Sequence, residues 1–216
     1  MSAVDRIQME TSAGTAVGSY SEALGGIAAI VLTILGLAHV APIFLVAIAT
    51  VAVGAALVIH SINLIQEFVR VLAQPRIAEL GGTSAGSLEL LGGAAGIVLG
   101  VLALLNIDPV DLVAIAAIGY GSSLLMSSSS ASRMMLARIE MAYDDQVRRR
   151  LASEIVISST VSQALSSLAA IVLGILALAG FSSIILVLIA LLSLGTVILL
   201  NGAALGGAVL AMVSRP

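Results

Sequence analysis

The feature that most constrains this chain is the stretch Leu91–Met126, in which two apolar runs are joined by a short polar turn. The turn reads Asn106-Ile107-Asp108-Pro109, and the only other charge nearby is Asp111. A bilayer core of ~30 Å needs ~20 mostly apolar residues per helix, and each run reaches that length once its flanks are included. The stretch therefore predicts a helical hairpin that enters a membrane.

The same unit occurs three times. Residues 24–61 align without gaps on 91–128 after a shift of 67 positions, and on 165–202 after a shift of 141. Twelve positions are identical in all three copies, and they include the glycines Gly54, Gly121 and Gly195. An internal repeat changes the prediction from six separate apolar segments to three repeated helical hairpins.

Composition supports a membrane location. The chain is 60% hydrophobic and 10% charged with a mean hydropathy of +1.18, whereas soluble domains are about 25% charged. We therefore expect an all-α polytopic membrane protein with six transmembrane helices and cytoplasmic amphipathic linker helices. There is no cysteine, so disulfides and thiol chemistry are excluded. The expected spans are Ala23–Ala38, Ile43–Ile59, Leu90–Leu105, Leu112–Met126, Leu168–Ala179 and Ile184–Leu200.

The linkers divide the chain into six parts. We expect the second helix to continue out of the membrane and to end near Pro75, because proline breaks the helical ladder. The longer linker carries a charged helical pattern, which would project from the membrane or bend at Ser127–Ser130. The predicted parts are a polar N-terminal segment 1–20, hairpin 21–61, linker helix 62–87, hairpin 88–127, linker helix 128–161, and hairpin 162–216 with a C-terminal helical extension.

The positions of the arginines predict the orientation of the chain in the membrane. There is no lysine, and all nine arginines lie in the termini or the two linkers, while the three hairpin turns contain none. Positive residues favour the cytoplasmic side. We therefore expect an integral membrane protein with both termini and both linkers in the cytoplasm.

The linker arginines Arg138, Arg148, Arg149 and Arg150 are candidate contacts for anionic lipids or for a partner protein. Basic residues at the inner membrane surface attract anionic lipids by ~1 kcal/mol each. Neighbouring acids, Asp144 and Asp145 among them, weaken that attraction, so a solvated face is an equal alternative.

Small residues recur every fourth position on the first helix of each hairpin. Small side chains at this spacing let two helix backbones approach closely in lipid. The sequence leaves open whether the seam packs within one subunit or between subunits. Its residues are Gly25, Ala29 and Thr33 in the first hairpin, Gly92, Gly96 and Gly100 in the second, and Ser166, Ala170 and Gly174 in the third.

Glu22, Glu89 and Gln163 occupy one equivalent position, three residues before each seam. A ring of two carboxylates and an amide at the cytoplasmic mouth of a pore could select cations. The simpler interpretation is that acids stabilise the first turn of a helix through its dipole. A similar structural role is expected of Asp108, as an N-cap before Pro109 and Asp111.

The remaining polar residues of the spans are interpreted as structural. His39 and His60 are the only histidines and should lie at opposite membrane faces as interfacial hydrogen-bonding groups, as should Asn63 and Asn201. Serines in membrane helices usually bond to their own backbone or to a neighbouring helix. The alternative is that Ser122, Ser123 and Ser127–Ser130 line a wet path beneath Tyr120.

No catalytic, cofactor-binding or metal-ligating residues are predicted, because the sequence contains no Walker loop, zinc-protease motif or Cys/His cluster. No buried carboxylate pair is expected, and no charged residue is expected in the middle of the membrane, which disfavours an ion-coupled transporter.

The hairpin unit Gly96–Gly121, GIVLGVLALLNIDPVDLVAIAAIGYG, resembles the repeat of HdeD-like acid-resistance membrane proteins. The resemblance covers about residues 21–201 and implies a small, six-helix protein of a bacterial inner membrane. The third copy departs from the pattern, with Ser183 where Pro42 and Pro109 stand in the first two. The long arginine-bearing linkers and the absence of tryptophan depart from it as well.

The sequence thus favours a non-enzymatic membrane protein with a structural or accessory role. Its expected partners are the lipid bilayer, anionic lipids, and copies of itself or other membrane subunits, with no role for nucleic acid. The alternative is a channel or facilitator for a small neutral or weakly polar solute.

A reporter scan tests the orientation. Because every arginine falls on one side, a reporter fused after Pro216 or inserted near Gly82 should be cytoplasmic, and one at Asp108 should be external. Linker reporters that are both external would contradict the predicted topology.

Overall fold

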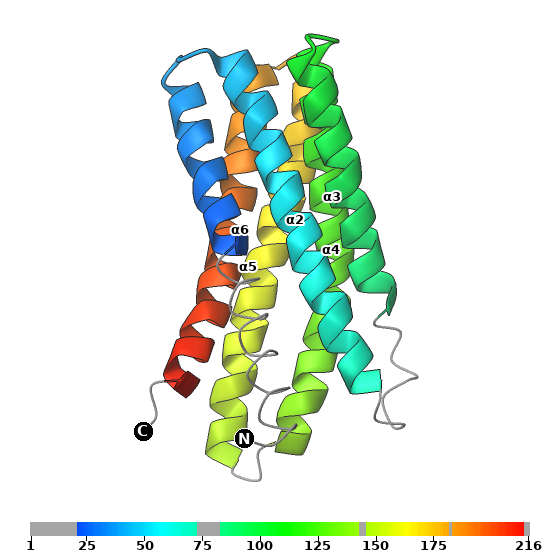
Figure 1. Ribbon diagram of the computed structural model, residues 1–216, viewed down its shortest axis with the longest axis vertical. Helices are drawn as coiled ribbons and strands as arrows, with labels where there is room; N and C mark the ends of the chain where they lie inside the picture. The colour runs from blue at the N-terminus through cyan, green and yellow to red at the C-terminus, as the bar shows by residue number, and fades with distance from the viewer. Residues whose placement is uncertain (1–20, 73–82, 143–145, 182, 214–216) are drawn as a thin grey trace, which may run out of the picture.

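The computed structural model describes residues 21–72, 83–142, 146–181 and 183–213, and these form six helices joined by short turns (Figure 1). The predicted all-α hairpins are confirmed, because helices that follow one another in the chain pack side by side. In order, the helices are Ser21–Leu37, α2 (Pro42–Leu72), α3 (Thr83–Leu104), α4 (Pro109–Ala142), α5 (Gln146–Leu178) and α6 (Ser183–Val213).

The first helices of the three hairpins end with the same backbone geometry. Each first helix ends with a residue at positive φ: His39 at 63°, Asn106 at 63° and Gly180 at 88°. In the first turn the N–H of Val40 bonds to the carbonyl of Leu35, and the N–H of His39 bonds to that of Gly36. The same pair of bonds closes the other two turns, which is the Schellman motif. The second helices start at Pro42, Pro109 and Ser183, and α4 has Asp111 in its first turn as predicted.

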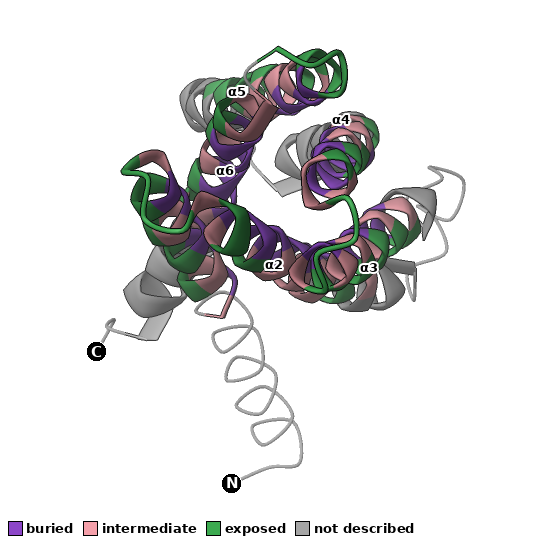
Figure 2. Cartoon of the chain, turned by 90° about the horizontal axis from the view of Figure 1, so that it is seen from above, coloured by how far each residue is buried: buried purple, intermediate pink, exposed green. Residues whose placement is uncertain are grey.

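The second helices of the hairpins form the inside of the bundle. α2, α4 and α6 all contact one another, α3 packs against α2 and α4, and α5 packs against α4 and α6. The helix Ser21–Leu37 lies against α2 and α6, since Gly25 approaches Ala56 while Gly26 approaches Leu199. Seen from above, buried surfaces face inward and exposed ones outward (Figure 2).

The inner helices fill the core at corresponding positions. Each position contributes one side chain from α2, one from α4 and one from α6, all at most 2% exposed and all in one cluster. These residues therefore form one continuous apolar core along the inner helices. From the turn end, the four sets are Val46, Val113 and Val187; Ala49, Ala116 and Ala190; Val53, Tyr120 and Leu194; and Leu57, Leu124 and Ile198.

The outside of the bundle suits lipid. Leu24, Leu91 and Leu165, one on each first helix, are 65%, 66% and 63% exposed. Five helices have segments long and apolar enough to cross a membrane, so the chain is an integral membrane protein by length and composition. The sixth helix, Ser21–Leu37, is apolar but has only 17 described residues.

Two helices differ from the expected linkers. α4 continues without interruption through Ser127–Ser130 to Ala142, so no bend there breaks the helix. α5 begins at Gln146. The predicted single linker helix 128–161 is therefore two helical extensions, which belong to α4 and α5. The expected continuation of α2 out of its span is confirmed as far as Leu72, and Pro75 lies outside the described residues.

The small-residue seam packs within the chain. A Cβ atom added at Gly92 would meet the side chain of Ser123 on α4, at 2.7 Å from its Cβ. One added at Gly100 would lie 2.8 Å from Val51 on α2. On the other first helices Gly25 and Gly174 make comparable contacts, Ala29 and Ala170 are fully buried, and Ser166 is half-buried.

Tyr120 depends on this seam. Its ring and hydroxyl occupy the space that a Cβ would take at Gly96, and its hydroxyl donates a 2.7 Å hydrogen bond to the carbonyl of Thr50. A Cβ at Gly54 would also come within 2.6 Å of that hydroxyl. Two glycines on two helices thus make room for one buried aromatic residue of a third.

Replacing Gly96 tests this packing. Gly96→Ala should lower the free energy of unfolding by about 1–3 kcal/mol, because overpacking displaces Tyr120, and Gly96→Leu should cost more. Thermal unfolding in mild detergent measures the effect. Gly119→Ala is the matched control on α4, since no atom lies within 4 Å of a Cβ there. Equal melting temperatures for Gly96→Ala and Gly119→Ala would contradict the packing role of the seam.

Candidate functional site

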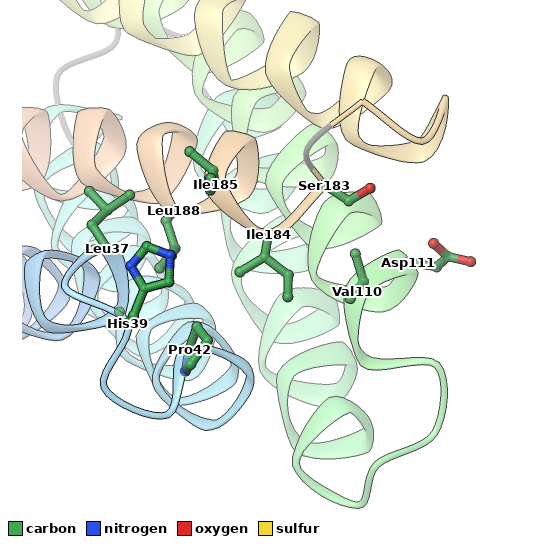
Figure 3. Close-up of a pocket in the computed structure, with 10 residues that line it drawn as sticks. Leu37, His39, Pro42, Val110, Asp111, Ser183, Ile184, Ile185 and Leu188 are labelled. Carbon is green, nitrogen blue, oxygen red and sulfur yellow. The ribbon is translucent and has the colours of Figure 1, made fainter.

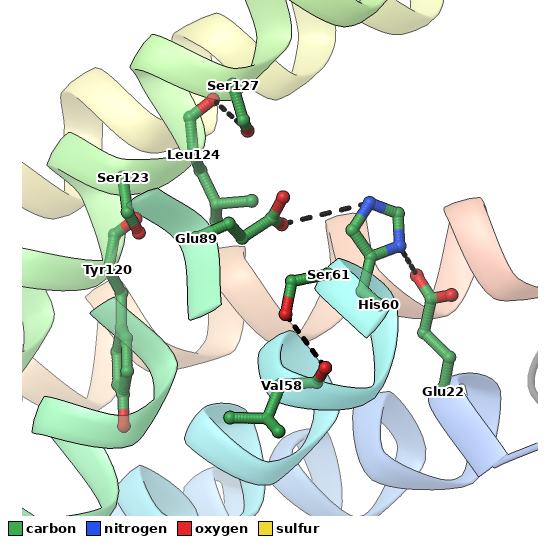
Figure 4. A network of polar contacts seen from close by, with 9 residues as sticks. All are labelled: Glu22, Val58, His60, Ser61, Glu89, Tyr120, Ser123, Leu124 and Ser127. Atoms are coloured by element: carbon green, nitrogen blue, oxygen red, sulfur yellow. Dashed lines mark hydrogen bonds and ion pairs between the residues drawn. The ribbon is translucent and has the colours of Figure 1, made fainter. Parts of the chain in front are cut away.

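A histidine and two glutamates meet (Figure 4) near the ends of the membrane-crossing segments that are away from the hairpin turns. Glu22 comes from the helix Ser21–Leu37, His60 from α2 and Glu89 from α3. His60 and Glu89 fall within the membrane-crossing segments Pro42–Ile62 and Gly86–Leu104. We refer to these three residues as the Glu–His–Glu cluster.

The imidazole stands between the two carboxylates. Nδ1 of His60 lies 2.8 Å from Oε1 of Glu22, and Nε2 lies 3.8 Å from Oε1 of Glu89. The Nδ1 contact has the distance of a hydrogen bond but not its angles. The first contact is close and the second is loose, and each is an ion pair when the imidazole is protonated and the facing carboxylate is ionised.

Both carboxylates are buried. Glu22 is 1% exposed and Glu89 is 0% exposed, whereas the His60 side chain retains 15% exposure. Within the described part of the chain, Oε2 of Glu22 and both oxygens of Glu89 have no hydrogen-bond partner. The expectation that no carboxylate pair is buried is therefore wrong.

Close helix contacts bring the cluster together. Gly25 follows Glu22 by three residues, and it packs against Ala56 of α2. Ala56 lies one helical turn before His60 on the same helix. On α3, Gly86 packs against Ile65 and Gly93 against Val58, so α3 touches α2 on both sides of His60. Without side chains at these glycines, the helices approach closely enough for the imidazole to reach both glutamates.

Serine hydroxyls surround the cluster. Ser61 is fully buried and donates to the carbonyl of Val58, while Ser127 on α4 donates to that of Leu124. Ser127 also lies beside the carboxylate of Glu89 (Figure 4). The hydroxyl of Ser127 therefore has two acceptors within reach, the carbonyl of Leu124 and the carboxylate of Glu89.

The predicted pore mouth is only partly assembled. Glu22 and Glu89 do lie together, but they are buried and paired with His60 instead of lining an opening. Gln163 is half-buried on α5, and its carbonyl accepts a bond from Ser167. The helix-dipole interpretation of Glu89 is wrong as well, because α3 begins at Thr83 and has no acid in its first turn.

The two histidines have different surroundings. His39 is exposed in a hairpin turn, where it adopts positive φ, and it fits the predicted interfacial role. His60 does not, because it is engaged with two acids. The sequence did contain a signal for this cluster. Glu22 precedes His39, and Glu89 precedes Asn106, by the same number of residues. His60 follows Pro42 by nearly that number. Similar distances from the turns place all three members of the cluster at one depth.

The structure describes some, but not all, of the other polar side chains for which the sequence predicted a role. The hydroxyls of Ser122, Ser123, Ser127 and Ser128 bond to carbonyls of their own helix, as the structural interpretation expected. Asn201 is half-buried on α6. The side chains of Asn63, Arg138, Arg148, Arg149 and Arg150 lie outside the described residues.

No protein-family model, curated protein or solved structure matches this chain.

Removing His60 tests whether the cluster holds the helices together. His60→Ala leaves the buried carboxylate of Glu22 without its close cationic partner, so the free energy of unfolding should fall by about 3–5 kcal/mol. Thermal or denaturant unfolding in detergent measures this loss. The control is His39→Ala, which removes an exposed histidine and should change stability little. Adding Glu22→Gln to His60→Ala should restore part of the loss, and no difference between the two histidine variants would contradict the ion pairs.

Proposed function

We propose that this chain is a non-enzymatic, six-span membrane protein with a structural or accessory role, built on a closed core rather than around a pore. The observation that carries the proposal is the packing of α2, α4 and α6. Four sets of three side chains, one from each helix, are buried in a single cluster.

The first helix supplies the sixth span. Its Gly26 packs against Leu199, near the end of the α6 span, and its Gly36 packs against Leu188, near the start. The helix therefore runs beside α6 over most of the membrane depth. Its 17 described residues extend ~25 Å at 1.5 Å each, close to the ~30 Å of a bilayer core.

The polar groups that could line a channel are already engaged. Tyr120 is fully buried and its hydroxyl bonds to α2. Thr33 and Thr50 bond to carbonyls of their own helices, as do the serines of α4. A solute passing between the inner helices would have to break these bonds and displace close-packed aliphatic side chains.

A cavity at the turn end does not provide a route through the bundle. It measures about 620 Å³ and lies between the starts of α2, α4 and α6, with His39, Asp111 and Ser183 among its lining residues (Figure 3). Leu188 is another of these residues, and it belongs to the buried core. The apolar core then separates this cavity from the Glu–His–Glu cluster at the other end.

The proposed accessory role places partner contacts on the linker side. The span of α4 ends at Ser128 but the helix continues to Ala142, and α5 begins at Gln146 although its span starts only at Thr160. Each extension is ~20 Å long. The linker arginines belong to these extensions, and they suit contact with anionic lipid or another subunit. The resemblance to HdeD-like proteins adds the proposal of a small inner-membrane protein.

A paired assay separates this role from a channel. Liposomes that contain the protein should release entrapped glycerol no faster than empty liposomes, because the core is closed. In native membranes, Arg138→Pro should break the α4 extension and disperse the native particle. Arg138→Ala is the matched control, since it removes the charge and keeps the helix. Glycerol release that depends on the protein, together with a monomeric native particle, would overturn the proposal.

A further inference from the structure

We propose that Glu22, His60 and Glu89 form a proton-binding site that is open to one side of the membrane, with Glu89 as the residue that gains and loses the proton. The proposal goes beyond the accessory role and does not depend on it. It rests on the charge of the cluster, the space around it and the unequal lengths of its two ion pairs.

The charges of the cluster do not balance without an extra proton. Two ionised carboxylates beside a protonated imidazole leave one net negative charge. Among the described side chains, no other charged group faces the cluster: His39, Asp108 and Asp111 are at the turn end, and Glu154 is exposed on α5. An unbalanced charge in a water-poor site is costly, and ionisable groups there usually neutralise.

The carboxylate oxygens have so little space around them that the size of the cation that could bind there is limited. Less than 1 Å² of surface is accessible on Oε2 of Glu22 and on each oxygen of Glu89. A water molecule needs a void of about one probe sphere, and a metal or ammonium ion needs similar room beside its ligands. The described residues also contain no group of three or more acids and histidines arranged as metal ligands. A proton is the one cation that needs no such space.

Geometry assigns the proton to Glu89. Oε1 of Glu22 lies 2.8 Å from Nδ1 of His60, so this pair is compact and its opposite charges stabilise each other. Glu89 is 3.8 Å from Nε2, and the Ser127 hydroxyl that lies near its carboxylate already donates to the carbonyl of Leu124. The acid with the longer and weaker ion pair gains most from becoming neutral.

The partial exposure of His60 favours access to the site from the linker side. His60 is the partly exposed member of the cluster, at 15%, and it lies at the end of the α2 span that is away from the hairpin turns. Toward the turns, the next residues inward are the fully packed Leu57 and Leu124. The imidazole can therefore exchange protons with the solution on the linker side and pass them to Glu89.

Binding of this proton connects two hairpins. Glu22 and His60 belong to the first hairpin, and Glu89 belongs to the second. An ionised Glu89 attracts His60, whereas a neutral Glu89 does not. The proton thus sets how firmly α3 is held to α2 at the linker side, next to the extensions through which partner contacts are proposed.

Infrared spectroscopy of the purified full chain tests the site. At neutral pH we expect the carbonyl band of one protonated carboxylic acid, which disappears at alkaline pH and is absent from Glu89→Gln. Labelling glutamate with carbon-13 should shift the band, which distinguishes it from aspartate. Asp111→Asn is the matched control, because Asp111 is exposed at the far end, and the band should remain.

Two results would overturn the proposal: no protonated carboxyl band in the folded wild-type protein, or an unchanged band in folded Glu89→Gln. If Glu89→Gln fails to fold, the alkaline loss of the glutamate band in the wild-type protein decides the matter. A liposome assay that detects glycerol release would contradict the closed core but leave the infrared result unaffected.

Discussion

The close approach of helix backbones is the constraint on which the rest of this structure depends. In lipid, apolar surfaces gain little from meeting each other, because acyl chains are as apolar as leucine side chains. The helices associate through van der Waals contact, which requires small residues where they cross. Gly26 against Gly195 and Leu199, and Gly93 against Gly54, are such crossings, and in each of them backbone atoms lie about 3 Å from a hypothetical Cβ.

Three glycines at one repeated position make corresponding contacts. Gly54 on α2 meets the carbonyl of Gly93 on α3, and Gly121 on α4 meets that of Ser167 on α5. Gly195 on α6 lies against Gly26 of the first helix. The second helix of each hairpin thus packs on the first helix of the next, and the last hairpin packs on the first. The repeat itself stays a prediction from the sequence, but these contacts are those that three equivalent units in a ring would make.

The same close packing produces both the solid core and the ionisable cluster. Glycines bring α3 against α2, which allows Tyr120 to fill the interior and allows His60 to reach Glu89. The positions that are identical in the three repeats do not all lie in the core, because Leu24, Leu91 and Leu165 face outward.

At the polar end of the bundle the three hairpins differ from one another. The positions that correspond to His60 are Ser127 and Asn201, so one sector of the bundle carries a histidine.

The sequence by itself determined the class of the protein and its hairpins. Long apolar runs leave few options other than membrane helices, and a proline or asparagine after such a run predicts a turn. The turn positions and the backbone bonds of the α4 serines were accordingly predicted. Tertiary structure decided the rest. The sequence does not show which helix packs against a given face of a glycine seam. Gly96 packs against Tyr120 of α4, and nothing near Gly96 in the chain indicates that contact. His60 was misinterpreted for a related reason: its charge partners Glu22 and Glu89 lie far from it in the chain, one on either side, and only the packing of three helices joins them.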